Sequence, residues 1–212
     1  MKSFLSILLF LILFAACKQE KGSPAANDKQ SETKTTLKEQ DRSVITKPSI
    51  FKTSTGKFIK LITEEKSSSL VDIKIIPIDF QNNKDTLRLT DIDPLQHAWI
   101  RDLDGNGYDE LYLISASAGS GSYGTIYGFA SNRDLSMTRV YVPEISEKDL
   151  LPDGNFYGYM GHDSIYTAEN RIYRKYPIYK EGDANCCPSG GSKTLSYHLK
   201  AGEATWILAI EK

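Results

Sequence analysis

The chain has 212 residues, of which 26 are Lys or Arg and 27 are Asp or Glu, so its formal net charge is −1. This balance gives no basic face of the kind that nucleic-acid binding requires, and it therefore excludes that class of partner. The few cysteines and histidines do not stand at zinc-site spacings. The length suits one globular domain with additional sequence.

Residues 1–16 are predicted to form a lipoprotein signal peptide. A short positive start is followed by the uncharged run SFLSILLFLILFAA, which is shorter than the roughly 20 residues of a membrane span. The ending FAAC resembles the bacterial lipobox, whose cysteine is lipidated, and this predicts a lipid anchor at Cys17. The alternative is an ordinary cleaved signal. Because Lys18 and not Asp follows, we expect an outer-membrane lipoprotein of a Gram-negative bacterium, facing the periplasm or the surface.

Residues 17–47 are predicted to form a flexible polar tether behind the lipidated cysteine. The stretch is rich in Lys, Glu, Gln, Ser and Thr and almost free of large apolar residues. Such a segment cannot bury enough surface to offset the entropy that ordering would cost. The folded domain is therefore expected to span residues 48–212.

The folded region reads as all-β. Apolar residues alternate with polar ones, β-branched and aromatic residues dominate, and Gly, Pro, Asn and Asp interrupt the runs at short intervals. This pattern is typical of a sandwich or barrel of short antiparallel strands, and we predict a β-sandwich with a protruding Gly/Ser/Tyr loop. One stretch, residues 144–151, suits a helix of one or two turns. The expected strand regions are residues 51–65, 69–80, 86–92, 97–103, 110–117, 124–132, 137–145, 164–180 and 193–210.

The segment RDLDGNGYDEL offers oxygen ligands at alternate positions, which is the spacing that a hard cation such as calcium prefers. It resembles the first half of an EF-hand loop but carries leucine at the twelfth position, and it is closer to the loops between strands of FG-GAP-type proteins. The alternative is an Asp/Asn/Gly turn without metal. No cofactor is required by the sequence, and any calcium here would be structural. The candidate ligands are Asp102, Asp104, Asn106, the Tyr108 carbonyl and Glu110.

The segment SASAGSGSYGT lies between two predicted strands and has the composition of a recognition loop. Glycine permits close approach to another surface, serine offers a compact donor and acceptor, and tyrosine presents a flat ring with few torsions to freeze. The alternative is a long glycine-rich hairpin turn. The candidate partner-binding residues are Gly119, Ser120, Gly121, Ser122, Tyr123 and Gly124.

The order of residues in LYLISASAGSGSYGTIYGF resembles the periplasmic inhibitors of invertebrate-type lysozyme, and so does the C-terminal run from IYKEGD to ATWIL. The resemblance covers roughly residues 50–212. It implies a β-sandwich whose Ser-Gly-x-Tyr loop enters the active-site cleft of the lysozyme. It further implies that Ser120 and Tyr123 reach the catalytic carboxylates of the enzyme.

Other segments offer weaker signals. The adjacent Cys186 and Cys187 are too close for ordinary disulfide geometry, which leaves a vicinal ring, a bond to another chain or free thiols. The run RIYRKYPIYK is locally basic and reads as a solvated strand face. In GHDSIY, His162 and Asp163 stand together, and we interpret them as a turn that opens a strand.

The function predicted from the sequence is inhibition of a lysozyme, most closely of the invertebrate type, by a binding protein that is not an enzyme. Its partners would be the lysozyme and, through Cys17, the membrane; a homodimer is left open. The alternative is a calcium-dependent binding or adhesion module centred on residues 102–110.

Overall fold

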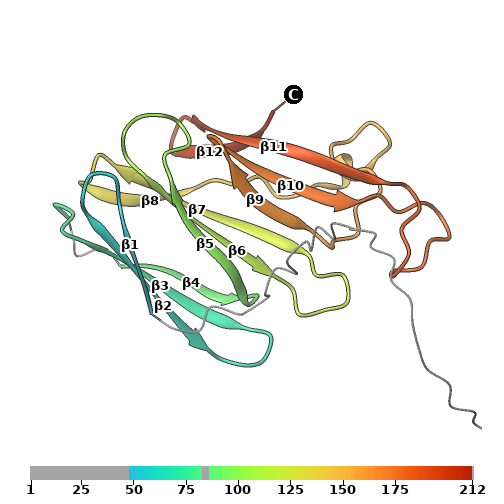
Figure 1. Cartoon of the computed structure of the whole chain (residues 1–212), viewed down its shortest axis with the longest axis horizontal. Helices are drawn as coiled ribbons and strands as arrows, with labels where there is room; N and C mark the ends of the chain where they lie inside the picture. The colour runs from blue at the N-terminus through green and yellow to red at the C-terminus, as the bar shows by residue number, and fades with distance from the viewer. Residues whose placement is uncertain (1–47, 83–85, 212) are drawn as a thin grey trace, which may run out of the picture. The chain divides into compact units, whose positions relative to one another are not determined.

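The computed structural model describes residues 48–82 and 86–211, which form antiparallel strands joined by turns (Figure 1). The predicted signal peptide (1–16), the lipidation site Cys17 and the predicted tether (17–47) lie outside the described residues. Within the described ranges, no helix has both the length and the apolar character that crossing a membrane demands.

The strands form three four-stranded antiparallel sheets, and each sheet is built from one continuous stretch of the chain. The first sheet has the order β1 (Ser49–Lys52), β2 (Phe58–Glu65), β3 (Val71–Ile78) and β4 (Leu87–Ile92). The middle sheet has the order β5 (Leu95–Arg101), β6 (Glu110–Ala116), β7 (Gly124–Asn132) and β8 (Ser136–Val140). The third sheet has the order β12 (Trp206–Ile210), β11 (Ser192–Ala201), β10 (Arg171–Pro177) and β9 (Ser164–Ala168).

The predicted all-β, antiparallel class is therefore confirmed, with three sheets layered on one another. Strand β3 shows why the sequence folds this way, since its side chains alternate strictly between buried and half-buried. Successive side chains of a strand point to opposite faces, so the first sheet has one apolar face. That face packs on the middle sheet around buried Ile73, Leu111 and Phe129.

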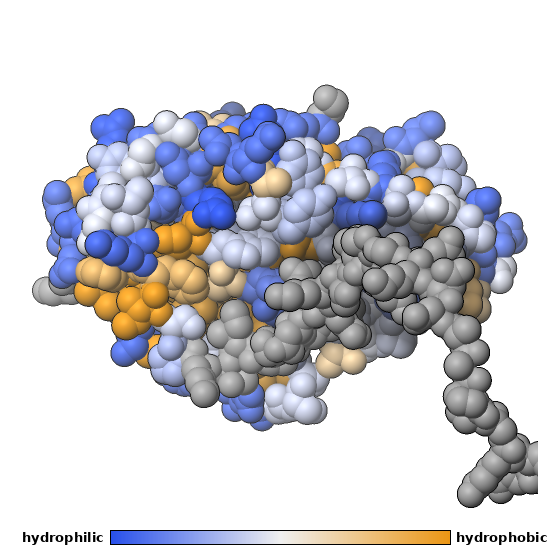
Figure 2. Space-filling model, viewed as in Figure 1, coloured by the Kyte–Doolittle hydropathy of each residue, from blue (hydrophilic) through white to orange (hydrophobic). Residues whose placement is uncertain are grey.

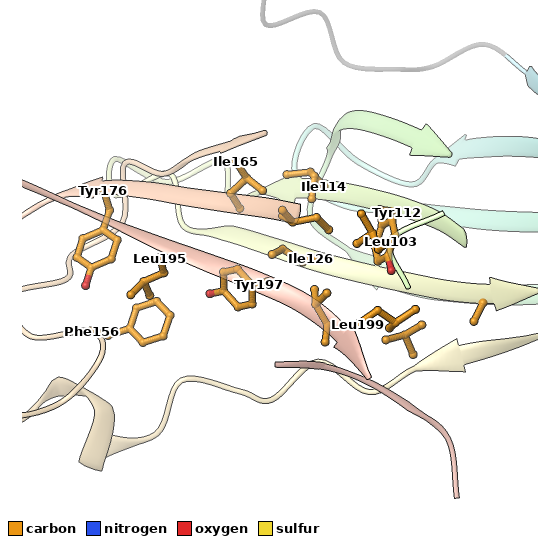
Figure 3. Packing of buried hydrophobic residues seen from close by; sticks show 14 residues of the cluster. Leu103, Tyr112, Ile114, Ile126, Phe156, Ile165, Tyr176, Leu195, Tyr197 and Leu199 are labelled. Carbon is orange, nitrogen blue, oxygen red and sulfur yellow. The ribbon is translucent and has the colours of Figure 1, made fainter. Parts of the chain in front are cut away.

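The middle sheet is covered on both faces. In β6, Leu111 and Leu113 pack toward the first sheet, whereas Tyr112 and Ile114 pack toward the third (Figure 3). A strand buried on both faces reads as a nearly continuous apolar run and not as an alternation. The sequence ELYLIS has this character.

The third sheet covers the other face of the middle sheet. Strands β10 and β11 turn alternate residues inward, including Ile172, Tyr176, Leu195 and Tyr197 (Figure 3). Phe156, from the segment between β8 and β9, joins this core and stacks on Tyr176 with ring centroids 5.7 Å apart.

The helix expected at residues 144–151 is a single short 3₁₀ turn, η1 (Glu147–Leu150), with no buried residue. On the face drawn in Figure 2, hydrophobic surface gathers at the left, where the strands of the first two sheets lie. At the right of this view, the surface is mainly hydrophilic or neutral.

Candidate functional site

The loop between β6 and β7 is closed by its own hydrogen bonds. The Ser117 N–H donates to the Tyr123 carbonyl over 3.0 Å, and the Ser122 N–H donates to the Gly119 carbonyl over 3.0 Å. The Ser117 hydroxyl accepts the Tyr123 N–H at 2.9 Å. These bonds give the glycine-rich segment one defined path between its two strands.

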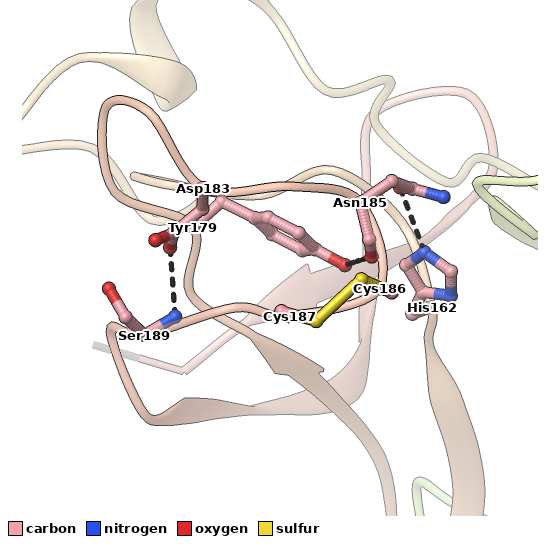
Figure 4. The surroundings of a disulfide bond; sticks show 7 residues. All are labelled: His162, Tyr179, Asp183, Asn185, Cys186, Cys187 and Ser189. Atoms are coloured by element: carbon pink, nitrogen blue, oxygen red, sulfur yellow. Dashed lines mark hydrogen bonds between the residues drawn. A yellow bond between two sulfur atoms is a disulfide. The ribbon is translucent and has the colours of Figure 1, made fainter. Parts of the chain in front are cut away.

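Two other segments hold the loop from outside. The His162 N–H donates to the Gly121 carbonyl over 2.7 Å, and the Asn185 side-chain amide donates to the Ser120 carbonyl over 3.1 Å. The side chains of His162 and Asn185 are themselves 3.2 Å apart, which links the two supports (Figure 4). The backbone carbonyls at the loop tip are thus fixed by partners 41 or more positions away in the sequence.

The Tyr123 ring is held on one side and open on the other. It packs edge-to-face on Tyr159, with centroids 5.7 Å apart and an interplanar angle of 78°, and 45% of the residue remains exposed. The ring lies over Gly121, where a Cβ atom would stand 2.4 Å from the ring carbon Cε2. Glycine at position 121 is therefore a condition for this ring position.

The C-terminal end of the loop is fixed by two ionisable residues, one in strand β10 and one directly before strand β9. Asp163 Oδ2 accepts the Gly124 N–H at 2.7 Å, and Arg174 donates to the Gly124 carbonyl over 3.2 Å. Asp163 also accepts the Tyr159 hydroxyl at 2.7 Å. One residue of the loop therefore has both of its peptide groups bound, and we call Asp163 and Arg174 the Gly124 clamp.

The clamp lies in a low-dielectric environment. Arg174 is 5% exposed and its guanidinium lies over the rings of Phe156 and Tyr197, at 5.5 and 6.0 Å from their centroids. Burial raises the pKa of Asp163, while the nearby Arg174 charge and the hydrogen bond from Tyr159 act in the opposite direction. The interpretation of RIYRKYPIYK as a solvated face was wrong for Arg174, because the alternation of β10 turns this side chain inward.

We predict that Gly124→Ala destabilises the fold by about 1–3 kcal/mol, the usual cost of overpacking. A Cβ atom there would lie 2.7 Å from Asp163 Oδ2 and 2.8 Å from a methyl group of Ile165. Urea unfolding measures the change. Gly119→Ala is the matched control, since its Cβ would meet no atom of the described residues within 4 Å and it should leave stability within about 0.5 kcal/mol. Equal stability of the two variants would contradict the tight packing at Gly124.

The segment between β10 and β11 presents Asn185 to the loop. A disulfide joins Cys186 to Cys187 (Figure 4). Of the three predicted alternatives, which were a vicinal ring, a bond to another chain and free thiols, the structure has the vicinal ring. The Tyr179 hydroxyl donates to the Asn185 carbonyl over 2.7 Å. Asp183 accepts the N–H groups of Lys180 and Ser189, each over 2.8 Å, and these bonds lower its pKa.

The acidic segment forms the turn between β5 and β6. Carboxylate oxygens of Asp102, Asp104 and Glu110 lie within 4.8 Å of one another. Asn106 donates its side-chain N–H to Asp104 Oδ2 over 2.9 Å, and its side-chain oxygen accepts the Tyr108 N–H at 2.7 Å. Burial raises the pKa of Glu110 to about 8, and the hydrogen bond from the Leu103 N–H opposes this change.

The two predicted sites stand at opposite ends of β6 (Figure 1). At about 3.4 Å per residue, this strand separates them by roughly 20 Å. They are therefore distinct, and neither completes the other. Sequence reasoning missed Asn185 and both residues of the Gly124 clamp, although the Gly-His-Asp turn at 161–163 was a local signal for one of them.

No protein-family model, curated protein or solved structure matches this chain. The functional argument therefore rests on the geometry and chemistry of the two loops. Of these, the loop at residues 119–124 has rigid support and an exposed aromatic ring, and it is the candidate site for a partner.

Proposed function

We propose that this protein inhibits a lysozyme by inserting the loop 119–124 into the cleft of the enzyme. One observation carries the proposal: the loop backbone is bound on several sides while its functional groups are unused. Within residues 48–82 and 86–211, the hydroxyls of Ser120 and Tyr123 have no hydrogen-bond partner, and both residues are exposed. Such a loop loses little conformational entropy when it binds.

The chemistry of the target fits these groups. Lysozymes use a pair of carboxyl groups around the sugar bond, one acting as an acid and one as a carboxylate. The Ser120 hydroxyl can donate to a carboxylate or accept from a carboxylic acid. The Tyr123 ring can take the place of a sugar ring, and its hydroxyl can reach a polar group beyond. The loop would therefore occupy the cleft without undergoing any reaction.

The invertebrate type is the lysozyme class that we favour, because the segment LYLISASAGSGSYGTIYGF resembles inhibitors of that class. In this proposal the protein is a binding protein and not an enzyme. A lipid at Cys17 would anchor it to the outer membrane, near the peptidoglycan that it protects.

A lysis assay tests the proposal. The full chain, purified in a non-ionic detergent, is added to cell walls that are digested by invertebrate-type, chicken-type or goose-type lysozyme. We expect selective loss of invertebrate-type activity near a one-to-one ratio. Inhibition of another class alone would keep the function and remove the family assignment. Absence of inhibition in all arms would overturn the proposal and favour the calcium-dependent binding module.

A further inference from the structure

The turn between β5 and β6 is wrapped around one carboxylate. Asp102 Oδ1 accepts the N–H groups of Gly105 and Asn106, at 2.8 and 3.1 Å, and Oδ2 accepts the Gly107 N–H at 2.8 Å. Asp104 accepts both the backbone and the side-chain N–H of Asn106. These bonds define the turn, and they leave further lone pairs on both carboxylates.

Glu110, the first residue of β6, adds a third carboxylate beside the turn. The residue is completely buried, and its Oε2 accepts the Leu103 N–H at 2.9 Å. Its Oε1 is buried and finds no hydrogen-bond partner among the described residues. A buried carboxylate oxygen without a partner is costly, and this one belongs to a group that lies within 4.8 Å of the carboxylates of Asp102 and Asp104.

Within residues 48–82 and 86–211, no cationic side chain forms an ion pair with this cluster. In the described part of the chain, Lys66, Lys74 and Arg171 form ion pairs with acidic residues outside the cluster. Asp109, adjacent to Glu110, adds a further negative charge and accepts the Ser54 N–H at 2.5 Å. Among the residues that the structure describes, nothing therefore supplies the converging oxygens with a compensating positive charge.

We propose that Asp102, Asp104 and Glu110 bind a divalent cation of the calcium class. The donor set consists of oxygen atoms alone, which hard cations prefer, and it contains no histidine or cysteine of the kind that zinc selects. The buried Glu110 supplies one ligand from the protein interior, and the two aspartates supply ligands from the turn. Water would complete the coordination on the exposed side.

The position of the site indicates what the cation does. Through Asp109 and Ser54, the turn is bonded to the β1–β2 connection, and the Ser54 hydroxyl also donates to the Gly107 carbonyl over 3.5 Å. A bound cation would therefore fix the junction between the first and middle sheets. It lies at the end of β6 remote from residues 119–124, so its role is structural and independent of the proposed inhibition.

The test measures calcium binding and thermal unfolding of the full chain in detergent, after treatment with EGTA. Calcium chloride is the probe, and magnesium chloride tests selectivity. We expect calcium to raise the unfolding temperature by several degrees and magnesium to act more weakly. Glu110→Gln keeps the acceptor for Leu103 and removes the charge, and it should weaken calcium binding at least about tenfold.

Asp104→Asn serves as a second variant at a less buried position, in case Glu110→Gln does not fold. Asp153→Asn removes an exposed carboxylate outside the cluster and should behave as the unaltered chain. A calcium-dependent shift that is lost in the cluster variants alone would support the site. Absence of a shift up to about 10 mM calcium, or an equal shift in the cluster variants, would overturn it.

Discussion

Replacement of Tyr123 by alanine is expected to raise the inhibition constant by about 30-fold, which corresponds to about 2 kcal/mol. The ring is 45% exposed, and it is already oriented by Tyr159 and by the absence of a side chain at Gly121. Such an aromatic anchor gives large contact area at low entropic cost. The measurement is the same lysis assay, with the inhibition constant determined for each variant.

Two further variants make this result specific. Tyr123→Phe keeps the ring and removes the hydroxyl, so it should lose less affinity than the alanine variant. Tyr141→Ala removes another exposed tyrosine, which is 56% exposed and lies outside the loop, and it should inhibit normally. If Tyr123→Ala inhibits as well as the unaltered protein, the loop has no part in the mechanism.

Replacement of Arg174 by methionine is expected to lower the free energy of unfolding by about 2–4 kcal/mol. The change leaves the Gly124 carbonyl without its donor, at about 1–3 kcal/mol for a buried acceptor, and it removes the cation over Phe156 and Tyr197. Urea unfolding measures the loss. Arg171→Met, on the same strand, breaks a surface pair with Glu211 and an exposed hydrogen bond to the Asn170 carbonyl, and should cost at most about 1 kcal/mol.

The deficit of Arg174→Met should also depend on pH. Burial already raises the pKa of Asp163 above its value in the unfolded chain. The protonated carboxyl group of Asp163 therefore adds stability at a pH below its unfolded pKa. This stability is lost as the pH rises through the folded pKa. Removal of Arg174 raises that folded pKa further, since Tyr159, His162 and the Gly124 N–H are then the groups left to favour the carboxylate. The deficit should be largest at neutral pH and should shrink on acidification. A deficit that is constant with pH would mean that the loss is one of packing alone.

The strand pattern predicted much of the fold, because alternation is a local property. The two strands within residues 58–78 follow from their alternation, and the strand at 110–116 follows from its nearly continuous apolar run. The layering into three sheets was not predicted, since alternation shows that a face is buried and not what covers it. The unbroken apolar run ELYLIS was the available signal that one sheet lies between two others.

The candidate loop could be located from sequence, but its support could not. Glycine, serine and tyrosine between two strands mark a turn with recognition chemistry, and this needs no long-range information. Asn185 contacts the loop from 65 positions away, and Arg174 reaches Gly124 from 50 positions away. A single sequence carries no record of such pairings. The basic character of the β10 segment instead led to the prediction that this strand face is exposed to solvent.

The contiguity of each sheet in the chain has a consequence for the order of folding. The first sheet closes on local turns, and such short-range pairings form early. The middle sheet can then bury Leu111 and Leu113 against the first sheet as soon as β8 has been synthesised. Its opposite face, with Tyr112 and Ile114, stays uncovered until β9 to β12 have been synthesised. A chain interrupted before residue 164 would thus carry an exposed apolar sheet face that favours aggregation. The last quarter of the sequence is therefore needed to cover the apolar face of the preceding sheet.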